Sequence, residues 1–246
     1  MRMAEADESG KALPLSTKNR ILDVAARLFA RTGIDAVSMQ EIMREAGVNV
    51  AAINYHFGSK ENLVSAMADR EAPQVAEHRL TLLSQCADGP GRPPLIEQIV
   101  EAFVRPTFLD RGQHGSIYGR RTMAILNFQG GETYSRIYNL HFLAVDRRFI
   151  QALVAALPGI PLDAIHWRYA SLIAAVMYAI TGGIRIRHLS KGLYDPTDIE
   201  RAVREIVSFQ SAAFRAEVSD GLNVEALKSG KEGGGPSPPE LLFHQR

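Results

Sequence analysis

The clearest chemical signal in the sequence is a serine followed by a lysine at the expected start of a helix. Ser59 is a good N-cap, and Lys60 falls in the first turn of the segment that it opens. The free N–H groups of a helix N-terminus and a lysine together make a phosphate-binding site. Lys60 is unfavourable for the helix itself, because the helix dipole prefers an anion at that end. The pair therefore indicates an anionic partner.

A short uncharged segment just before this pair could present hydrogen-bonding groups to such a partner. Asn49 fits as the N-cap of a helix that runs to His56. The expected inner face holds Ile53 and Phe57, four residues apart. The opposite face holds small residues or residues with an amide or hydroxyl group: Val50, Ala51, Asn54 and Tyr55. A helix of this length is about 12 Å long, and a DNA major groove about 12 Å wide admits it.

An earlier short helix would hold this segment in position. Ser38 and Glu41 form a capping-box pattern at its start. An apolar stripe follows, made by Ile42, Met43 and Ala46. Gly47 then tolerates the positive φ of a sharp turn. Residues 38–57 therefore predict a helix-turn-helix, although an ordinary corner between two helices would also place glycine at the turn.

The helix-turn-helix segment and the Ser59-Lys60 pair follow an earlier amphipathic segment in an order and spacing that are typical of one protein family. The chain reads ILDVAARLFARTG from residue 21 and SMQEIMREAGVNVAAINYHFGSKENLV from residue 38. The block from Thr17 to about Ala68 resembles the DNA-binding domain of the tetracycline-repressor (TetR) family of bacterial transcription regulators. The specific elements are the A-G-V turn, the Y-H-F end, and S-K-E after one glycine. The rest of the chain fits the family in architecture and length only.

The resemblance implies roles for individual residues. Ser38 would cap the second helix and bond a backbone phosphate. The residues expected at base edges are Val50, Ala51, Ala52 and Asn54, and those expected at phosphates are Tyr55, His56 and Lys60. Many members have Gly or Pro where this chain has Ala51, and an aromatic residue where it has Asn54. An asparagine could read adenine N6 and N7 together, which is worth about 1–3 kcal/mol of discrimination.

Three of these residues also have a purely structural alternative. Asn54 could be a solvated helix amide, and Tyr55 could pack against the preceding helix. His56 could supply a second cap or a hydrogen bond in the core. Contact with DNA requires Asn54 and Tyr55 to point outward, with Lys60 near the same edge.

The composition indicates a globular chain. It has 246 residues, of which 46% are hydrophobic and 22% charged, with a net charge of +1. A near-neutral balance confines any phosphate-binding surface to a small region. The single cysteine, Cys86, excludes an intramolecular disulfide and a thiolate metal cluster, in keeping with a cytoplasmic protein. No apolar run reaches the roughly 18 residues of a membrane span, so we expect no membrane partner.

Periodicity and turn residues predict an all-α fold in four parts. The N-terminal helix-turn-helix DNA-binding domain is followed by an all-helical domain for ligand binding and dimerisation. The boundaries are a disordered arm at 1–15, the DNA-binding domain at 16–72, the effector and dimerisation domain at 73–220, and a disordered tail at 221–246.

Proline and glycine are used to predict where the later helices begin and end. Pro73 should kink or break a long helix after Ser59, and Pro106 should end the next one. Single helices are expected from about Thr133 to Leu157 and from Leu162 to about His188. Asp195-Pro196 should open the last helix, as N-cap and first helical residue.

The last two long helices are rich in small and apolar residues. Paired helices of this kind at a chain end favour a two-fold homodimer. In the TetR family, two subunits form a four-helix bundle here. The alternative is the core of a monomer.

The middle helices carry an apolar and aromatic set with a few polar groups, as in pockets for small organic molecules. Its members are Phe103, Phe108, Tyr118, Met123, Asn127, Tyr138, Phe142, Trp167 and Tyr178. Ordinary core packing is the alternative for each. Four arginines could meet an anionic ligand or serve as surface charges: Arg120, Arg121, Arg185 and Arg187. The scattered histidines have no metal-ligand spacing, so no metal, cofactor or catalytic residue is expected.

The combined prediction is a dimeric, ligand-responsive DNA-binding regulator, most often a repressor in this family. Its partners would be a near-palindromic double-stranded DNA operator, a second copy of the chain and a small-molecule effector. One alternative is a constitutive DNA-binding protein whose C-terminal part binds a protein. Another is an all-helical enzyme or carrier, which lacks support because the sequence has no nucleophile–base pair and no cofactor fingerprint.

Overall fold

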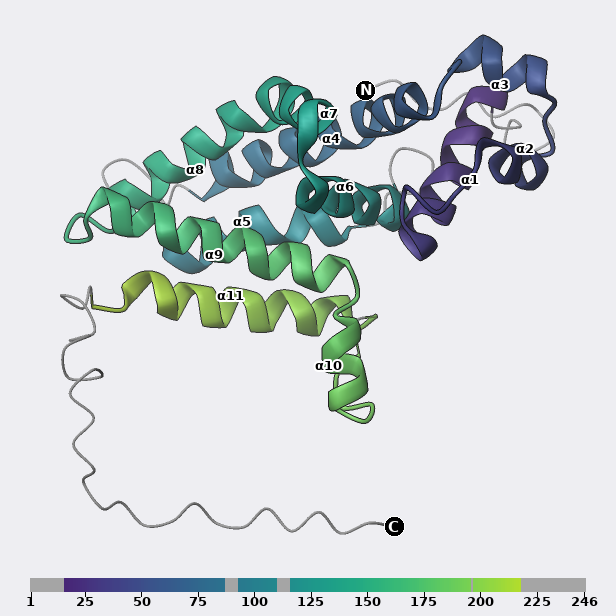
Figure 1. Ribbon diagram of the computed structural model, residues 1–246. Coiled ribbons are helices and arrows are strands. Elements are labelled where there is room, and N and C mark those ends of the chain that lie inside the picture. The colour runs from purple at the N-terminus through teal and green to yellow at the C-terminus, as the bar shows by residue number, and fades with distance from the viewer. Residues whose placement is uncertain (1–15, 87–92, 110–115, 196, 218–246) are drawn as a thin grey trace, which may run out of the picture. The chain divides into compact units, whose positions relative to one another are not determined.

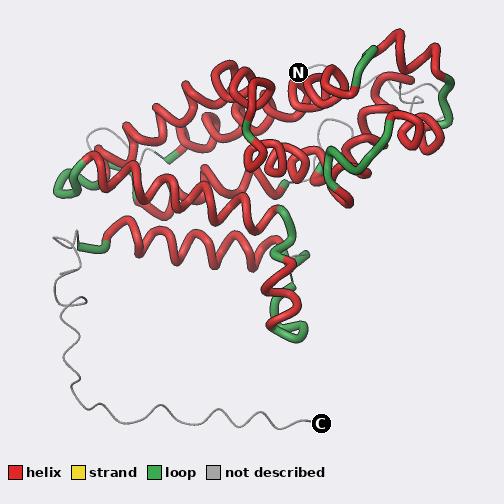
Figure 2. The backbone as a smooth tube through the Cα atoms, in the orientation of Figure 1, coloured by secondary structure: helices red, strands yellow, loops and turns green. Residues whose placement is uncertain are grey.

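The chain folds entirely into helices over the part that the structure describes. The computed structural model describes residues 16–86, 93–109, 116–195 and 197–217, and every regular element in these ranges is helical (Figures 1 and 2). The predicted all-α class is thus confirmed. Residues up to Ala216 form one compact unit. The predicted arm at 1–15 and tail at 221–246 lie outside the described residues.

Three helices build the N-terminal block: α1 (Thr17–Thr32), α2 (Met39–Ala46) and α3 (Val50–His56). Their apolar faces meet the start of the next helix in a small core. The largest buried side chains of that core are Phe29, Ile42, Ile53, Leu63 and Met67. Ser16 caps α1, with its Oγ accepting from the Asn19 N–H at 3.3 Å. The block is therefore held by a small core built on its apolar stripes, to which Leu126 and Ile137 from later in the chain also contribute.

The long helix α4 (Lys60–Gln85) leads from this block into the larger part of the chain. Pro73 lies inside α4, and the helix continues through it rather than breaking. The predicted domain boundary between residues 72 and 73 falls within this helix. Contacts on both sides of Pro73 bury the same face of α4, from Leu63 to Arg79.

The remaining elements form the larger helical layer. They are α5 (Ile96–Phe108), α6 (Ile117–Gln129), α7 (Gly131–Ile137), the π-helical turn η2 (Tyr138–Phe142), α8 (Leu143–Ala156), α9 (Leu162–Ile180), α10 (Ile184–Leu189) and α11 (Ile199–Arg215). Their core surrounds Phe103, Phe149 and Tyr169, whose rings meet edge to face. Helices α9 and α11 run side by side (Figure 1), and α11 also packs on α5.

Several predicted helix ends were wrong. Pro106 lies in the last turn of α5 and removes one backbone N–H donor there, but the helix continues through it to Phe108. The expected helix at 162–188 breaks because Gly182 and Gly183 adopt φ of +91° and +47°. The last helix begins at Ile199 with Asp198 as its N-cap, not at Asp195-Pro196. The helix expected at 133–157 contains the π-helical turn η2.

The small and large cores join through α1 and α6, which pack together. At this contact the buried Thr122 hydroxyl donates to the Ala26 carbonyl at 3.2 Å. Within the described ranges, no helix is both long enough and apolar enough to cross a membrane.

Candidate nucleic-acid interface and internal cavity

Helix α3 is anchored by one face and leaves the other open. The side chains of Ile53 and Phe57 are 1% and 6% exposed. Asn49 caps the helix, with its Oδ1 accepting from the Ala52 N–H at 2.9 Å. A helix of seven residues has little stability of its own, so these contacts determine its orientation.

The outward face of α3 carries most of the residues expected to meet DNA bases. Val50 is 58% exposed and Tyr55 is 86% exposed. Ala51 and Asn54 are exposed as well, whereas Ala52 and His56 are half-buried. The Tyr55 ring contacts only the edge of His56 among aromatic partners in the described chain, at 5.1 Å between centroids. The structure thus leaves Asn54 and Tyr55 outside the core.

Helix α2 and its turn fix how α3 leaves the core. The Ser38 Oγ accepts from the Glu41 N–H at 3.1 Å, which is half of the predicted capping box. The reciprocal bond from Glu41 does not form among the described residues. Gly47 adopts φ +61° and ψ 43°, the left-handed conformation that the turn requires. Ser38 remains exposed, at the N-terminus of α2.

The start of α4 lies next to this surface. Ser59 caps α4, with its Oγ accepting from the Asn62 N–H at 3.1 Å. The Lys60 Nζ donates to the Asp35 carbonyl at 3.2 Å and keeps N–H donors for another acceptor. A backbone N–H and the Ser59 hydroxyl lower the pKa of Glu61, so this helix end already favours a negative charge.

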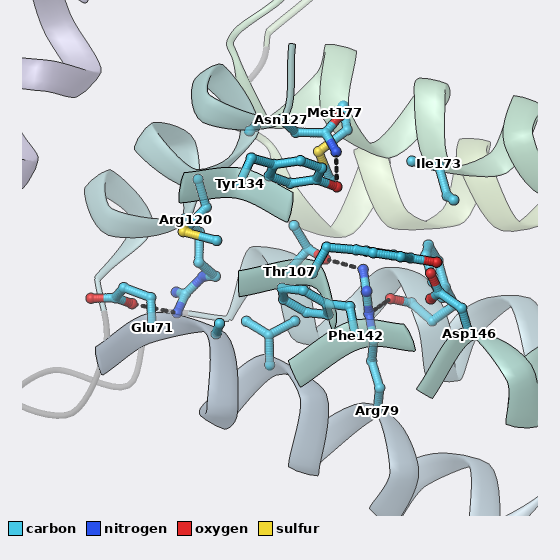
Figure 3. A pocket seen from close by; sticks show the side chains of 16 residues that line it. Glu71, Arg79, Thr107, Arg120, Asn127, Tyr134, Phe142, Asp146, Ile173 and Met177 are labelled. Carbon is cyan, nitrogen blue, oxygen red and sulfur yellow. Dashed lines mark hydrogen bonds and ion pairs between the residues drawn. The ribbon is translucent and has the colours of Figure 1, made fainter. Parts of the chain in front are cut away.

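A second site is a cavity of about 140 Å³ inside the larger helical layer (Figure 3). Side chains from α4, α5, α6, α7, η2, α8 and α9 line it. They are Glu71, Ala72, Val75, Arg79, Phe103, Thr107, Arg120, Met123, Ala124, Asn127, Tyr134, Tyr138, Phe142, Asp146, Ile173 and Met177.

Five residues of the predicted ligand-binding set line this cavity: Phe103, Met123, Asn127, Tyr138 and Phe142. The other four do not. Phe108 is buried elsewhere in the core, and Tyr118, Trp167 and Tyr178 are 41%, 79% and 42% exposed. Two of the five lining residues belong to the π-helical turn: Tyr138 and Phe142 are its first and last residues, and both line the cavity.

Arg79 brings a positive charge into the cavity from α4. Its side chain is 5% exposed. Its Nε donates to the Phe103 carbonyl at 3.0 Å, and Nη2 donates to the Thr107 hydroxyl at 3.1 Å (Figure 3). The guanidinium carbon also lies 3.7 Å from the centroid of the Phe103 ring. Burial lowers the pKa of Arg79 from its ordinary value.

Asp146 contributes a carboxylate from α8. It accepts a hydrogen bond from the Tyr169 hydroxyl at 2.8 Å and another from Tyr138. Burial raises the pKa of Asp146, and these hydrogen bonds and the Arg79 charge oppose the shift. Burial also raises the pKa of Tyr169, which keeps its hydroxyl protonated as a donor.

A chain of charged groups connects the cavity to α1. Glu71, which is 1% exposed, lies 3.3 Å from Arg70 Nη2 and 3.9 Å from Arg120 Nη1. Arg70 Nη1 in turn pairs with Asp23 of α1 at 2.7 Å. Burial raises the pKa of Glu71, and the two arginines oppose that shift. Asp23 is therefore two ion pairs away from a carboxylate that lines the cavity.

The sequence interpretation missed most of the polar residues of this cavity. The missed polar residues are Glu71, Arg79, Thr107, Tyr134 and Asp146. One available signal was the spacing on α4, where Glu71 and Arg79 share a face with Ala72, Val75 and Ala76. A charged residue on an apolar helical stripe is a candidate for a buried role.

Comparison with known proteins gives two family matches. Residues 21–67 match the model of bacterial regulatory proteins of the tetR family. Residues 101–213 match the model of a tetracyclin repressor-like C-terminal domain.

Among curated proteins, the chain is 39% identical over 64 residues to the HTH-type transcriptional regulator AcrR of Shigella flexneri. This match covers 26% of the chain and 30% of that protein. It is 36% identical over 64 residues to the HTH-type transcriptional repressor AcnR of Corynebacterium glutamicum, covering 26% of the chain and 34% of AcnR. The matches thus span about a third of these relatives.

Solved structures share the fold over most of the chain. A tetR-family regulatory protein from Rhodococcus RHA1 has a TM-score of 0.56 at 15% identity, covering 83% of this chain and all of that one. The fatty acid degradation regulator FadR from Bacillus halodurans has a TM-score of 0.55 at 12% identity, covering 84% of this chain and 100% of that one. AibR, solved with isovaleryl coenzyme A and operator DNA, has a TM-score of 0.53 at 19% identity, covering 79% and 97%.

Proposed function

Because the chain belongs to the TetR family of bacterial transcriptional regulators, we propose that it binds a specific DNA operator and leaves it when a small molecule binds. The observation that carries this proposal is the outward face of α3, which is exposed and uncharged, beside the partly free ammonium of Lys60. Residues 21–67, which include α3, match the model of bacterial regulatory proteins of the tetR family, and relatives named as a regulator and a repressor match 64 residues of the chain.

In this proposal α3 enters the major groove. Bases are read by the side chains of Val50, Ala51, Ala52 and Asn54. Phosphates are bound by Ser38, Tyr55, His56 and Lys60. An uncharged reading face suits this task, because it exposes amide and apolar groups to base edges and leaves charge at the margin.

A second copy of the chain would supply the other reading helix. Trp167 on α9 and Phe209 on α11 are 79% and 71% exposed, which is unusual for large apolar side chains unless a surface covers them. Pairing these two helices across a two-fold axis would make a four-helix bundle. Two α3 helices would then reach half-sites about 10 base pairs apart on a near-palindromic operator.

The cavity supports the ligand-responsive part of the proposal. Its wall includes Glu71, which the Arg70–Asp23 ion pair connects to α1. A ligand that favours another arrangement of α4 would alter the spacing of the two α3 helices. A tenfold loss of operator affinity requires only about 1.4 kcal/mol of coupling. AibR, which has the same fold, was solved with both isovaleryl coenzyme A and operator DNA. A regulator of this kind would act in the cytoplasm.

The proposal is tested with genomic fragments of the source organism. The purified full-length protein should retain a fragment that contains an inverted repeat. The double variant Asn54→Ala, Tyr55→Ala should fold but fail to retain it. Retention of all fragments alike by both proteins would contradict sequence-specific recognition. A retained fragment that no extract of small molecules releases would favour the constitutive alternative.

A further inference from the structure

The cavity wall carries a cation that forms no ion pair with a carboxylate of the described residues. Arg79 is 5% exposed, and its two printed acceptors, the Phe103 carbonyl and the Thr107 hydroxyl, are both neutral. No ion pair of the described residues includes Arg79. A buried charge is costly unless a counter-ion and hydrogen bonds compensate it. The rings of Phe103 and Phe142, at 3.7 and 5.9 Å, compensate it in part.

Arg79 retains donors for a ligand. A guanidinium has five N–H groups, and the hydrogen bonds of Arg79 engage Nε and Nη2. Within the described chain, Nη1 has no hydrogen-bond acceptor. Asp146, which lies near Arg79 in the cavity wall (Figure 3), is already bonded to the hydroxyls of Tyr169 and Tyr138. Nη1 of Arg79 is therefore available to an acceptor that the described residues do not supply.

We propose that the effector is a small organic carboxylate whose anionic group binds Arg79. This inference rests on the proposed function, in which the cavity is the effector site. A planar carboxylate matches the fork of a guanidinium and forms charge-assisted hydrogen bonds with it. It would supply a direct ion pair, which Arg79 does not form with Asp146, the carboxylate that shares the cavity with it.

The volume of the cavity and its apolar side chains define the part of the ligand that lies away from the carboxylate. The cavity volume is about 140 Å³. A cavity of about 150 Å³ accommodates benzene. Apolar side chains make up much of the wall, among them Val75, Ala124 and Ile173. The carboxylate therefore carries one aromatic ring or a branched alkyl group of similar size.

A cationic ligand such as an organic amine is disfavoured, because the carboxylates of the cavity already have partners. Asp146 is bonded to two tyrosines, and Glu71 lies between Arg70 and Arg120. An ammonium group in the cavity would also meet the Arg79 charge. Benzoate, benzamide and benzylamine share one ring and differ in charge, so they separate these possibilities.

Titration calorimetry of the full-length protein measures the affinity for each probe. We expect benzoate to bind about tenfold or more tightly than benzamide, since charge-assisted hydrogen bonds are about twice as strong as neutral ones. Benzylamine should bind more weakly than either. Equal affinities for benzoate and benzamide, tighter binding of benzylamine, or no binding of benzoate would overturn the proposal.

Three variants locate the binding. Arg79→Met keeps the length of the side chain but removes its charge, and should bring benzoate and benzamide to near parity. Arg105→Met is the matched control, because Arg105 pairs with Glu101 and Glu200 outside the cavity. Met123→Trp should fill the cavity and block both probes. If Arg79→Met fails to fold, two measurements still test the proposal. They are the ratio of benzoate to benzamide affinity in the wild type and the loss of binding of both probes in Met123→Trp.

Binding of DNA is measured separately, without any probe. A protein that retains its operator but shows no preference for benzoate would overturn this inference alone. A protein that prefers benzoate, loses the preference in Arg79→Met and binds no specific DNA would contradict the proposed function. The two failures are therefore distinguishable.

Discussion

At the scale of single residues, the two candidate sites use charge in opposite ways. The surface proposed to face DNA exposes uncharged groups on α3 and places Lys60 at its margin. The cavity encloses Arg79, Glu71 and Asp146 in an apolar wall. A lysine at the surface, such as the half-buried Lys60, would contribute mainly through phosphate contacts that salt weakens, whereas buried charges respond to pH and to the charge of a ligand.

Substitution of Lys60 tests the phosphate contact. Lys60→Gln should weaken binding to all DNA sequences alike and reduce the slope of log affinity against log salt by about 0.9, as expected for one lost phosphate contact. Fluorescence anisotropy over a salt series measures this slope. Arg148→Gln, an exposed cation on α8, should leave it unchanged. An unaltered slope in Lys60→Gln would remove Lys60 from the contacts with DNA.

Glu71 should make stability depend on pH. Burial raises its pKa in the folded protein above the reference value of 4.5. The stability it contributes is therefore fully present below that value and is lost as pH rises through the raised pKa. The free energy of unfolding of the wild type, relative to Glu71→Gln, should fall over this interval by about 1.4 kcal/mol per unit of pKa shift. Chemical denaturation of both proteins at several pH values measures this difference in unfolding free energy. A difference that stays constant or rises with pH would contradict a raised pKa for Glu71.

At the scale of elements, the contact between α4 and α6 is closer than a side chain would allow. A Cβ built on Gly119 would lie 2.4 Å from Cδ of Glu71. Glycine at this position therefore lets α6 approach the buried carboxylate, with Arg120 following on the same helix. The geometry around Glu71 depends on the absence of one methyl group.

Gly119→Ala should destabilise the protein by about 1–3 kcal/mol, the usual cost of overpacking. Thermal unfolding measures the change. Gly159→Ala is the matched control, since its Cβ would meet no atom within 4 Å. Combining Gly119→Ala with Glu71→Ala should cost less than the sum of the two single changes, because the clash is removed. Additive effects would indicate that the methyl group is accommodated elsewhere.

Elements with a clear local signal could be predicted from the sequence. The apolar stripe of α1, the turn at Gly47 and the outward placement of Asn54 and Tyr55 all depend on nearby residues. The end of α9 could not be predicted this way. The apolar helical pattern continues past Gly182 and Gly183, and only the structure shows that these two glycines adopt positive φ and end the helix. The cavity was predicted only in part. Seven elements meet there, and nothing in a single helix indicates that Arg79 and Asp146 share one space.

At the scale of the whole molecule, the proposed mode of DNA binding requires two copies of the chain. The exposed faces of α9 and α11 are the proposed dimer surface. The α3 helices are separate elements, whereas α9 also contributes Ile173 and Met177 to the cavity wall. In this arrangement a change at the cavity reaches DNA by altering the distance between two reading helices. Monomers would each hold one half-site and lose the combined affinity.

Phe209→Glu should therefore weaken the dimer. A charge in the centre of an apolar interface should raise the dissociation constant at least tenfold, or about 1.4 kcal/mol. Sedimentation velocity over a concentration series measures it. Phe128→Glu, which changes a 64% exposed side chain on α6, is the control and should remain dimeric. A wild-type protein that sediments as a monomer at micromolar concentration would contradict the half-site model.

The most direct test of DNA reading by α3 is a comparison of binding-site preferences between the wild type and Asn54→Ala. Selection from a random DNA library should give the wild type an inverted repeat. Asn54→Ala should select the same repeat with one base relaxed at the symmetrical position of each half-site, a loss of about 1–3 kcal/mol per contact. Preferences that are identical in the two proteins, or uniform weakening at every position, would contradict base reading by Asn54.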